Sequence, residues 1–446
     1  MHPFTRLLPC LWLAAATGLA QAPATRPNII FILADDLGQG QLGCYGQKLI
    51  QTPRLDRMAA EGTRFTQAYT GTAVCAPSRA SLMTGLHMGH CPIRANRETK
   101  PDGQMPLPEK IPTVAQILKD AGYATACTGK WGLGMWDTPG SPLKKGFDFF
   151  YGYNCQRHAH SYFPEFLWRN DRKEALDGKT YSQNLIQKEA LGWVRANAAK
   201  PFFLYYAVTL PHAQLEIDDP GIYRDRPWTD KQKTLAAMIT RLDHDVGELL
   251  DLLAELHIDD NTIVFFSGDN GSDFPAGSDM DKLFDQTGGL RGIKRSLYEG
   301  GLRQPSIVRW PGRVPVRVCD EPWAFWDFLP TATALAGATP PAGLKTDGLD
   351  LTAFLTGGPA PKRECFYWEL HEGPPLQAVR FGDWKAVRKA PKGGVELYDL
   401  ATDPGEKKDV SGARPKLVGK ALDLFARNRT ADPAWPVPPA WNAKPE

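Results

Sequence analysis

The sequence carries almost no net charge and no long run of basic residues. Its 52 Lys and Arg against 50 Asp and Glu leave a formal net charge of +2 over 446 residues. Proteins that bind nucleic acid or anionic lipid through electrostatics need a basic patch or balance, so neither is an expected partner. The hydrophobic content of 42% is too high for a disordered chain. We therefore expect one large folded domain with a smaller one, or two to three ordinary domains.

A hydrophobic stretch long enough to cross a membrane is also missing after the first residues. Residues 7–20 are an apolar run preceded by Arg6 and followed by the small-x-small sequence of residues 20–22. That pattern is typical of a secretory signal peptide and its cleavage site. No later run reaches the roughly 18 apolar residues of a spanning helix. We expect residues 1–22 to be removed and the mature chain to be exported to the periplasm or secreted.

Cysteine is scarce, and one of the eight, Cys10, lies in the expected signal peptide. The seven others are Cys44, Cys75, Cys91, Cys127, Cys155, Cys319 and Cys365. Because seven is odd, at least one cysteine in an oxidising compartment is free, modified or bonded outside the chain. We expect one or two disulfides and some buried thiols among them.

Apolar runs alternate with amphipathic segments over the first three quarters of the chain. Strands are expected at 28–34, which is apolar after Asn28, and at 202–208, which is apolar throughout, because such runs are typical of strands buried on both faces; residues 262–266 form a similar run. Helices are expected at 113–121 and at about 229–256, where apolar residues recur at helical spacing. The alternation predicts a mostly parallel sheet with helices on both faces.

The chain changes character at the Gly/Pro-rich segment 357–361. Short strands are expected beyond it, at 365–370, 376–381, 384–387 and 395–398. A helix near 415–428 follows them. The sequence therefore predicts a catalytic domain over 26–356 and, over 362–446, a small antiparallel sheet with one helix and an irregular tail.

Oxygen-bearing side chains follow two of the apolar strands. Asp35 and Asp36 come directly after the first, while Asp269 and Asn270 follow the strand at 262–266. Ligands of parallel sheets lie beyond the carboxyl ends of the strands, so the four side chains are expected at one edge. Hard oxygen donors suit calcium better than zinc. Either pair alone could merely start a turn, but the two together favour a metal site.

The most specific stretch is CAPSRASLMTG at residues 75–85. It resembles the sulfatase signature C-x-P-S-R-x-x-L-x-T-G at every fixed position. In that family a maturation enzyme oxidises the cysteine to formylglycine, here at Cys75. We expect a short helix from Ser78 and Arg79, with residue 75 near its N-terminus, where anions are favoured. As a bare thiol, Cys75 could instead be an ordinary low-pKa nucleophile beside Arg79, or simply buried.

The resemblance covers most of the mature chain. Further segments similar to sulfatases occur in the family's order, at 26–36, 129–131, 211–212, 267–271, 290–294 and 299–301. The family has the alkaline-phosphatase-like α/β fold with a small C-terminal subdomain. That architecture agrees with the alternation and the change of character described above.

The resemblance implies a calcium ion as cofactor, beside the formylglycine. Asp35, Asp36, Asp269 and Asn270 would bind this ion, and residue 75 would complete its shell together with the sulfate. The metal expected from the strand ends and the modified residue expected from the signature thus belong to one site.

Four further residues would hold the sulfate and move protons. Arg79, Lys130 and Lys294 would hold the formylglycine and the sulfate oxygens, because transferring anionic oxygens need fixed cations. Taken singly, each would more often be a solvated surface charge. A hydroxyl of the hydrated aldehyde would attack sulfur while His212 or Lys294 protonates the departing alcohol. The second hydroxyl would then lose its proton and expel sulfate.

One position departs from the family. Members commonly carry histidine directly after the Lys-Trp pair, where it contacts the formylglycine hydroxyl in the release step, but this chain has Gly132. We predict that His160 reaches the pocket and supplies the base, with His158 as the next candidate. A loop histidine is more often exposed, and without a substitute base sulfate release would be slow.

These residues and the resemblance predict a sulfuric ester hydrolase that acts on a sulfated small molecule or glycan. The alternatives are a phosphonate monoester or phosphodiester hydrolase of the same superfold, and a non-catalytic glycan-binding homologue, which only Gly132 favours. A carbohydrate is the preferred substrate, since Tyr162, Trp168 and Trp228 in loops could stack on sugar rings. The sequence does not indicate which alcohol carries the sulfate.

Overall fold

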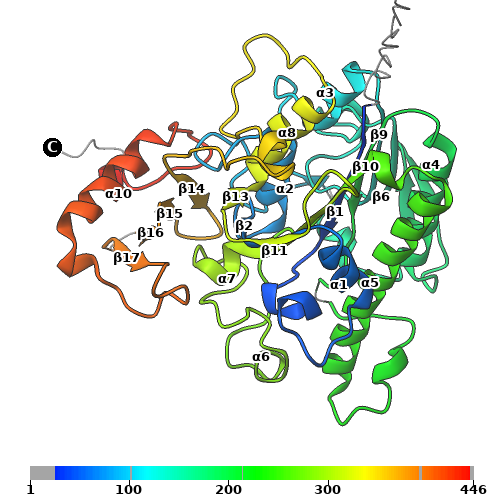
Figure 1. Cartoon of the computed structure of the whole chain (residues 1–446), viewed down its shortest axis with the longest axis horizontal. Helices are drawn as coiled ribbons and strands as arrows, with labels where there is room; N and C mark the ends of the chain where they lie inside the picture. Colours follow the sequence, from blue (N-terminus) through cyan, green and yellow to red (C-terminus); the bar gives the residue numbers. More distant parts are fainter. Residues whose placement is uncertain (1–25, 101–102, 213, 391–393, 442–446) are drawn as a thin grey trace, which may run out of the picture.

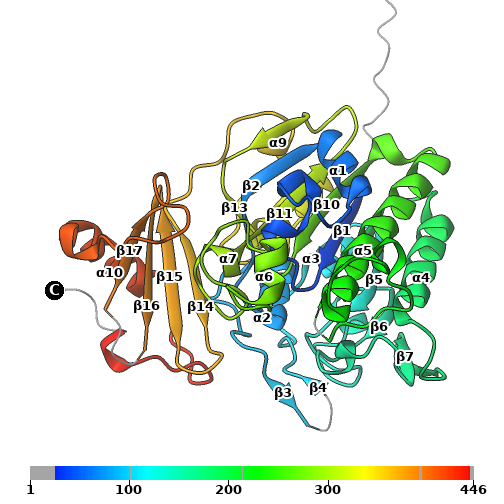
Figure 2. The ribbon, with the colours of Figure 1, turned by 90° about the horizontal axis from the view of Figure 1, so that it is seen from below.

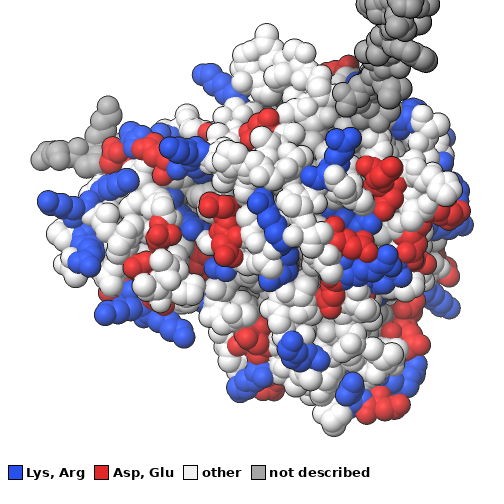
Figure 3. All heavy atoms as spheres, in the orientation of Figure 1, with Lys and Arg blue, Asp and Glu red and all other residues white. Residues whose placement is uncertain are grey.

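The computed structural model describes residues 26–100, 103–212, 214–390 and 394–441. The expected signal peptide lies outside the described residues. A large mixed sheet with helices forms the main body, and a smaller sheet lies beside it (Figure 1). On the face that Figure 3 shows, positive and negative side chains are interspersed.

The large sheet has parallel strands in the middle and antiparallel pairs on both sides of them. In spatial order its strands are β12 (Arg317–Cys319), β2 (Thr63–Tyr69), β11 (Arg303–Arg309), β10 (Thr262–Gly268), β1 (Asn28–Ala34), β9 (Phe202–Ala207), β5 (Ala124–Lys130), β6 (Phe149–Tyr153), β7 (Phe166–Arg169) and β8 (Arg172–Ala175), with β13 (Trp323–Ala324) paired to β2. Strand β1 pairs in parallel with β10 and β9, and β5 pairs in parallel with β9 and β6. Strands β11, β7 and β8 are antiparallel to their neighbours. At one edge β12 and β13 pair in parallel with β2. The predicted mostly parallel sheet is therefore confirmed.

Helices cover both faces of this sheet. They are α1 (Pro53–Ala60), α2 (Cys75–Thr84), α3 (Val114–Asp120), α4 (Ser182–Asn197), α5 (Asp230–Glu255), α6 (Asp279–Phe284), α7 (Glu299–Leu302), α8 (Phe328–Leu335) and α9 (Thr352–Leu355). Side chains of a strand alternate between faces, so Phe31 packs in one core with α2, α3 and α8. Ile30 and Ile32 pack in a second core with α1, α4 and α5. Figure 1 shows α4 and α5 together on one side of the sheet.

Local capping explains where the two helices on the α5 side begin. Thr229 and Gln232 form a capping box at the start of α5. Helix α1 is capped by a residue distant in sequence, because Asp243 of α5 accepts hydrogen bonds from the backbone N–H groups of Arg54 and Leu55 at 3.0 and 2.7 Å. The contact between the helices thus also satisfies the helix end.

The C-terminal sheet is antiparallel, as predicted. Its strands are β14 (Phe366–Leu370), β15 (Leu376–Phe381), β16 (Trp384–Lys389) and β17 (Glu396–Asp399), in that order. Helix α10 (Pro415–Arg427) packs on one face through Leu424 and Phe425. The other face packs on the main body, where Trp368 meets Tyr69 and Trp326. Figure 2 shows this sheet with α10 on its outer side. The boundaries at 356 and 362 stay a prediction.

Some expectations were incomplete or wrong. Strands β2 and β11 and helices α4 and α8 were not foreseen. Six cysteines are free thiols, at positions 44, 75, 91, 127, 319 and 365. With six of the seven as thiols, no two cysteines remain to form a bond with each other. The one or two disulfides expected are therefore not found in the described residues.

Candidate active site

The four oxygen donors expected at the sheet edge lie together. Asp35 and Asp36 follow β1, and the parallel register aligns the end of β1 with the end of β10, which Asp269 and Asn270 follow. The Asp36 backbone N–H donates to Asp269 Oδ1 at 3.1 Å. Asn270 Nδ2 donates to Asp36 Oδ1 at 2.6 Å. All four side chains are buried. Sheet pairing therefore gathers three carboxylates and an amide out of water.

Two buried cations from α2 and β5 pair with these carboxylates. Arg79 donates through Nε and Nη2 to Asp269 Oδ2 at 3.0 and 2.8 Å. Its Nη1 donates to the Lys130 carbonyl at 2.6 Å. Lys130 ends β5, and its Nζ donates to Asp35 Oδ2 at 2.6 Å. Both cationic side chains have 0% exposure. Burial disfavours such charges, so each depends on its carboxylate partner.

A third cation and a histidine contact Asp36. Lys294 Nζ donates to Asp36 Oδ2 at 2.7 Å and lies 3.1 Å from His212 Nε2. Burial lowers the pKa of His212 to about 3, against the pull of Asp36 and Asp35. The ring is therefore neutral and accepts from Lys294 at Nε2, which leaves its proton on Nδ1. Nδ1 has no hydrogen-bond partner among the described residues.

The pKa values of the two strand-end aspartates reflect these pairings. Burial acts to raise the pKa of Asp35, but Lys130, His212 and Arg79 outweigh it and hold the pKa well below its ordinary value. Burial acts in the same way on Asp36, where Lys294 is the main opposing charge and the pKa is again lowered. Both carboxyl groups are therefore ionised.

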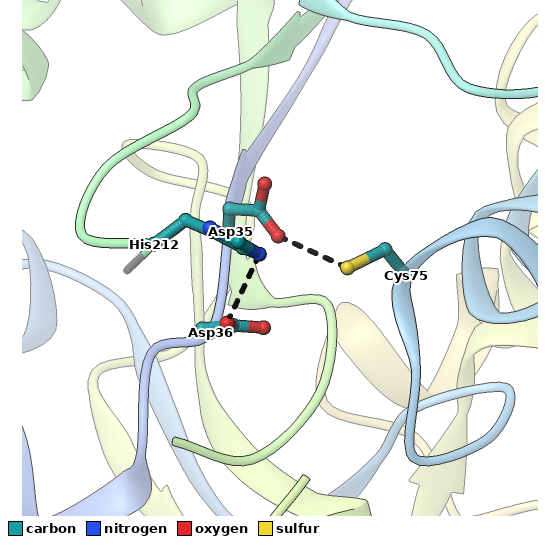
Figure 4. Close-up of side chains that lie close together, drawn as sticks. All are labelled: Asp35, Asp36, Cys75 and His212. Atoms are coloured by element: carbon teal, nitrogen blue, oxygen red, sulfur yellow. Dashed lines mark hydrogen bonds and ion pairs between the residues drawn. The ribbon is translucent and has the colours of Figure 1, made fainter. Parts of the chain in front are cut away.

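Cys75 is the first residue of α2, three residues earlier than the predicted helix start. Its Sγ donates to Asp35 Oδ1 at 3.3 Å. Figure 4 shows the Cys75 side chain directed toward Asp35, with Asp36 and His212 beside them. Burial is the main cause that raises the pKa of the thiol well above its ordinary value, followed by Asp269 and Asp35. The alternative of a low-pKa thiol nucleophile is therefore wrong for the encoded cysteine.

A cavity of about 280 Å³ opens above this cluster. The buried residues of its lining form the floor: Cys75, Gln104, Gln156, His212 and Lys294. Exposed residues form its rim: Glu98, Arg157 and Arg295. Glu98 and Gln104 belong to the hairpin of β3 (Glu98–Thr99) and β4 (Gly103–Gln104), which projects from the main body in Figure 2. A larger cavity of about 960 Å³ elsewhere, beside residues 341–347, contains none of the predicted site residues.

His160 lines the same cavity. It ends a short 3₁₀ helix at His158–His160, and its ring stacks on that of His212 with centroids 4.3 Å apart. Burial lowers its pKa to about 4, so the ring is neutral and can accept a proton. The ring of His158 instead packs against Tyr153 and Phe166. The structure places His160 within the pocket, and its role as a base stays a prediction.

Sequence reasoning missed Gln156. Gly132 has a φ of +74°, and a Cβ built there would come within 2.0 Å of Gln156 Nε2. The end of the Gln156 side chain therefore occupies the space beside the glycine backbone. One signal was available, because a glycine where a histidine is expected leaves a volume that another side chain must fill.

The aromatic residues expected to stack on sugar rings do not line the pocket, so that expectation is wrong. Tyr162 is fully buried, and its hydroxyl donates to the carbonyls of Thr209 and His212 at 2.7 and 3.1 Å. Trp168 is also buried. Trp228 packs against two core rings. Burial of apolar area holds these rings in the core, and Tyr162 also fixes the backbone of His212.

No helix among the residues that the structure describes combines the length and the hydrophobicity needed to cross a membrane.

Comparison with known proteins adds an independent finding. The family model described as Sulfatase matches residues 27–338, and the model described as N-sulphoglucosamine sulphohydrolase, C-terminal, matches residues 292–420. N-acetylgalactosamine-6-sulfatase of Canis lupus familiaris is 36% identical over 407 residues, covering 84% of this chain and 73% of the relative. Arylsulfatase A of Homo sapiens is 32% identical over 502 residues, covering 98% and 94%. The crystal structure of Ps i-CgsB in complex with k-i-k-neocarrahexaose superposes with a TM-score of 0.81 at 29% identity, covering 93% of this chain and 96% of that chain.

Proposed function

This chain belongs to the sulfatase family of sulfuric ester hydrolases, and from that premise we propose that it removes sulfate from a carbohydrate ester with formylglycine at residue 75 and a calcium ion. One observation carries the proposal. Cys75 lies at the floor of a pocket and contacts a buried cluster in which Arg79, Lys130 and Lys294 pair with three carboxylates. Such a cluster suits an anion whose negative charge moves between oxygens during transfer.

A metal ion would change the net charge of the cluster. Each of its three carboxylates pairs with one of its three buried cations, so these charges cancel. A divalent cation bound there would leave a positive site that attracts the sulfate ester.

The donor set fits calcium. Asn270 Oδ1 is buried and has no hydrogen-bond partner among the described residues, which leaves a hard acceptor available beside Asp35, Asp36 and Asp269. We propose these four residues as the ligands. When bound, calcium would polarise the sulfate oxygens and favour ionisation of a hydroxyl on residue 75.

The position of residue 75 supports its modification. As a thiol it is a poor nucleophile because burial and the neighbouring carboxylates raise its pKa. Formylglycine would supply the hydroxyls of a hydrated aldehyde at the first turn of α2, where the helix dipole favours negative charge. Arg79 and Lys130 would orient this residue and the sulfate oxygens.

The neighbouring histidines and Lys294 are placed to move protons. His212 Nε2 and Lys294 Nζ lie 3.1 Å apart at the floor of the pocket, so we propose that this pair donates a proton to the departing alcohol oxygen. His160, neutral and stacked on His212, would accept the hydroxyl proton that must leave before sulfate is released.

The rim of the pocket favours a carbohydrate. It offers hydrogen-bonding groups from Glu98, Arg157 and Arg295, and none of the described residues that line the pocket is Phe, Tyr or Trp. Hydroxyl-rich substrates satisfy such groups better than an aryl ester does. The names of the relatives point the same way, since one is an N-acetylgalactosamine-6-sulfatase and another was crystallised with a neocarrahexaose.

A panel of esters tests this proposal. Protein made in a host with a formylglycine-generating enzyme is incubated with sulfated mono- and oligosaccharides, and with an aryl sulfate, phosphate and phosphonate of the same alcohol. Sulfate release from a sugar is expected to be fastest, and Cys75→Ala should abolish it. Faster cleavage of the phosphonate than of every sulfate ester would contradict the proposal and favour the phosphonate hydrolase.

We further propose that the chain is exported after loss of residues 1–22 and is modified at residue 75 by a formylglycine-generating enzyme. N-terminal sequencing of protein recovered from the periplasm or medium tests the first point. Proteolysis confined to 357–361 would support the division into a catalytic domain over 26–356 and a subdomain over 362–446.

A further inference from the structure

We propose that Gln156 is a substrate-binding residue whose side-chain amide donates a hydrogen bond to a sulfate oxygen in the pocket. The inference rests on the proposed function, because it deepens the description of the same site. It assigns a role to a residue that neither the strand-end pattern nor the cysteine signature indicated.

Gln156 lies at the floor of the cavity and not at its rim. Its side chain is 5% exposed, and it lines the cavity together with Cys75, His212 and Lys294. The next residue, Arg157, is exposed at the rim. Since the floor holds the residue that reacts, the part of the substrate that meets Gln156 is the sulfate.

The amide of Gln156 has no partner inside the protein. Neither Nε2 nor Oε1 forms a hydrogen bond among the described residues, although both atoms are buried. Buried amides are normally satisfied, since an unpaired one loses its hydration without compensation. A buried donor that lines this cavity and has no partner among the described residues is available to complete its hydrogen bond with a ligand.

The local backbone leaves space for this amide. Trp131 and Gly132 continue the pairing of β5 with β6, because their N–H groups donate to the carbonyls of Tyr153 and Asn154 at 2.9 and 3.1 Å. This pairing sets Gly132 beside Gln156. A Cβ at position 132 would force the end of the Gln156 side chain to move, and a φ of +74° also favours glycine. The glycine thus makes room for the glutamine.

An amide suits the task in one further respect. It is neutral at every pH, so it adds a donor without altering the charge of the cluster formed by Lys130, Lys294 and the carboxylates. It cannot accept a proton, so it leaves the role of base to His160. The imidazole that the resemblance implies at position 132 would combine binding and proton transfer, whereas this chain divides them between two side chains.

Binding of inorganic sulfate to the calcium-loaded, full-length protein tests the inference without turnover. Calorimetric titration compares the wild type with Gln156→Leu, which keeps the volume and removes the polar atoms. Loss of a hydrogen bond to a charged oxygen is expected to weaken sulfate binding about ten- to hundred-fold. Gln187→Leu is the matched control, because Gln187 is equally buried but bonds only to protein groups. Its sulfate affinity should equal that of the wild type, with any loss confined to Tm.

A second variant separates a role in binding from a role in structure. Gln156→Glu places a carboxylate against the sulfate, so sulfate binding should be weaker than in Gln156→Leu at pH 8. The defect relative to the wild type should shrink as the pH falls, because a protonated carboxyl regains a donor. A purely structural glutamine would give no such pH-dependent recovery.

Three results would overturn the inference. The first is equal sulfate affinity in folded Gln156→Leu and wild type. The second is an unchanged sulfate affinity with a raised KM for a sugar ester, which would place the amide on the alcohol. The third is a constant Gln156→Glu defect from pH 8 to pH 5. Failure of the proposed function looks different, since the wild type would then bind sulfate but release none from any ester.

Discussion

Asn270→Ala should remove the response of this protein to calcium. Asn270 Oδ1 is the buried acceptor without a partner among the described residues, while Nδ2 of the same side chain orients Asp36. The substitution deletes one proposed ligand and releases another. Stability is linked to binding, so a ligand at 100 times its Kd stabilises the folded state by about 2.7 kcal/mol.

The expected shift in Tm follows from the size of the protein. For 446 residues the entropy of unfolding is on the order of 0.9 kcal/mol/K. A stabilisation of about 2.7 kcal/mol then raises Tm by about 3 °C. Differential scanning calorimetry in chelator and in a calcium series should show this rise for the wild type, and Asn270→Ala should show little or none.

The control separates loss of the ion from loss of stability. Asn28 is buried at the opposite end of β1, where Nδ2 donates to Thr262 Oγ1 at 3.0 Å. Asn28→Ala should lower Tm in every buffer and keep the calcium shift. A calcium shift of the same size in Asn270→Ala and wild type would refute the assignment of Asn270 as a ligand. An unchanged Tm and full activity of the wild type after exhaustive chelation would refute the metal site as a whole.

The other predictions concern the modified residue, the base and a helix cap. A tryptic peptide spanning Cys75 should weigh less than its cysteine form, because an aldehyde replaces the thiol; mass spectra showing only cysteine in fully active protein would be incompatible with the proposed chemistry. His160→Ala should slow turnover at least ten-fold, as loss of a general base typically does, while one equivalent of alcohol is still released in a burst. His158→Ala is the matched control. Steady-state rates equal to wild type in both variants would exclude His160 as the base. Burial raises the pKa of Asp243 to about 6, so the folded state favours the protonated carboxyl. The resulting stabilisation is fully present below the unfolded pKa of about 4 and is lost as the pH rises through about 6, with a magnitude on the order of 2 to 3 kcal/mol. Asp243→Asn keeps an acceptor for the N–H groups that begin α1 and should remove this pH dependence of stability. Urea unfolding between pH 4 and 8 measures it. An identical pH profile in the variant would contradict the assignment of the dependence to Asp243.

Local features of the sequence were enough to predict the central strands. Residues 29–34 are apolar throughout, which is typical of a strand buried on both faces, and that strand lies in the middle of the sheet. The strands at the sheet edges were missed. Strand β2, for example, has no strict alternation of buried and half-buried residues, and its partner β11 lies more than 200 residues away. Pairings at such distance leave no local periodicity to detect.

The position of the acidic residues at the strand ends was enough to predict that they share one edge of the sheet. Asp35 and Asp269 are far apart in sequence, yet parallel strands place both at the same edge. The pairing of carboxylates with buried cations was only implied by the resemblance. Packing decided it, because Arg79 and Lys130 lose all contact with water and each then needs a carboxylate.

The sequence by itself determined the family, through the CAPSRASLMTG stretch, and the strand ends that carry the acidic residues. Only the tertiary structure decided which other side chains contact the acidic residues at these strand ends. Gln156 reaches the pocket because β5 pairs with β6, and Tyr162 leaves solvent because its ring fits the core. Both outcomes depend on volume and on the partners of buried polar atoms. These properties belong to the packed interior, and a one-dimensional pattern does not contain them.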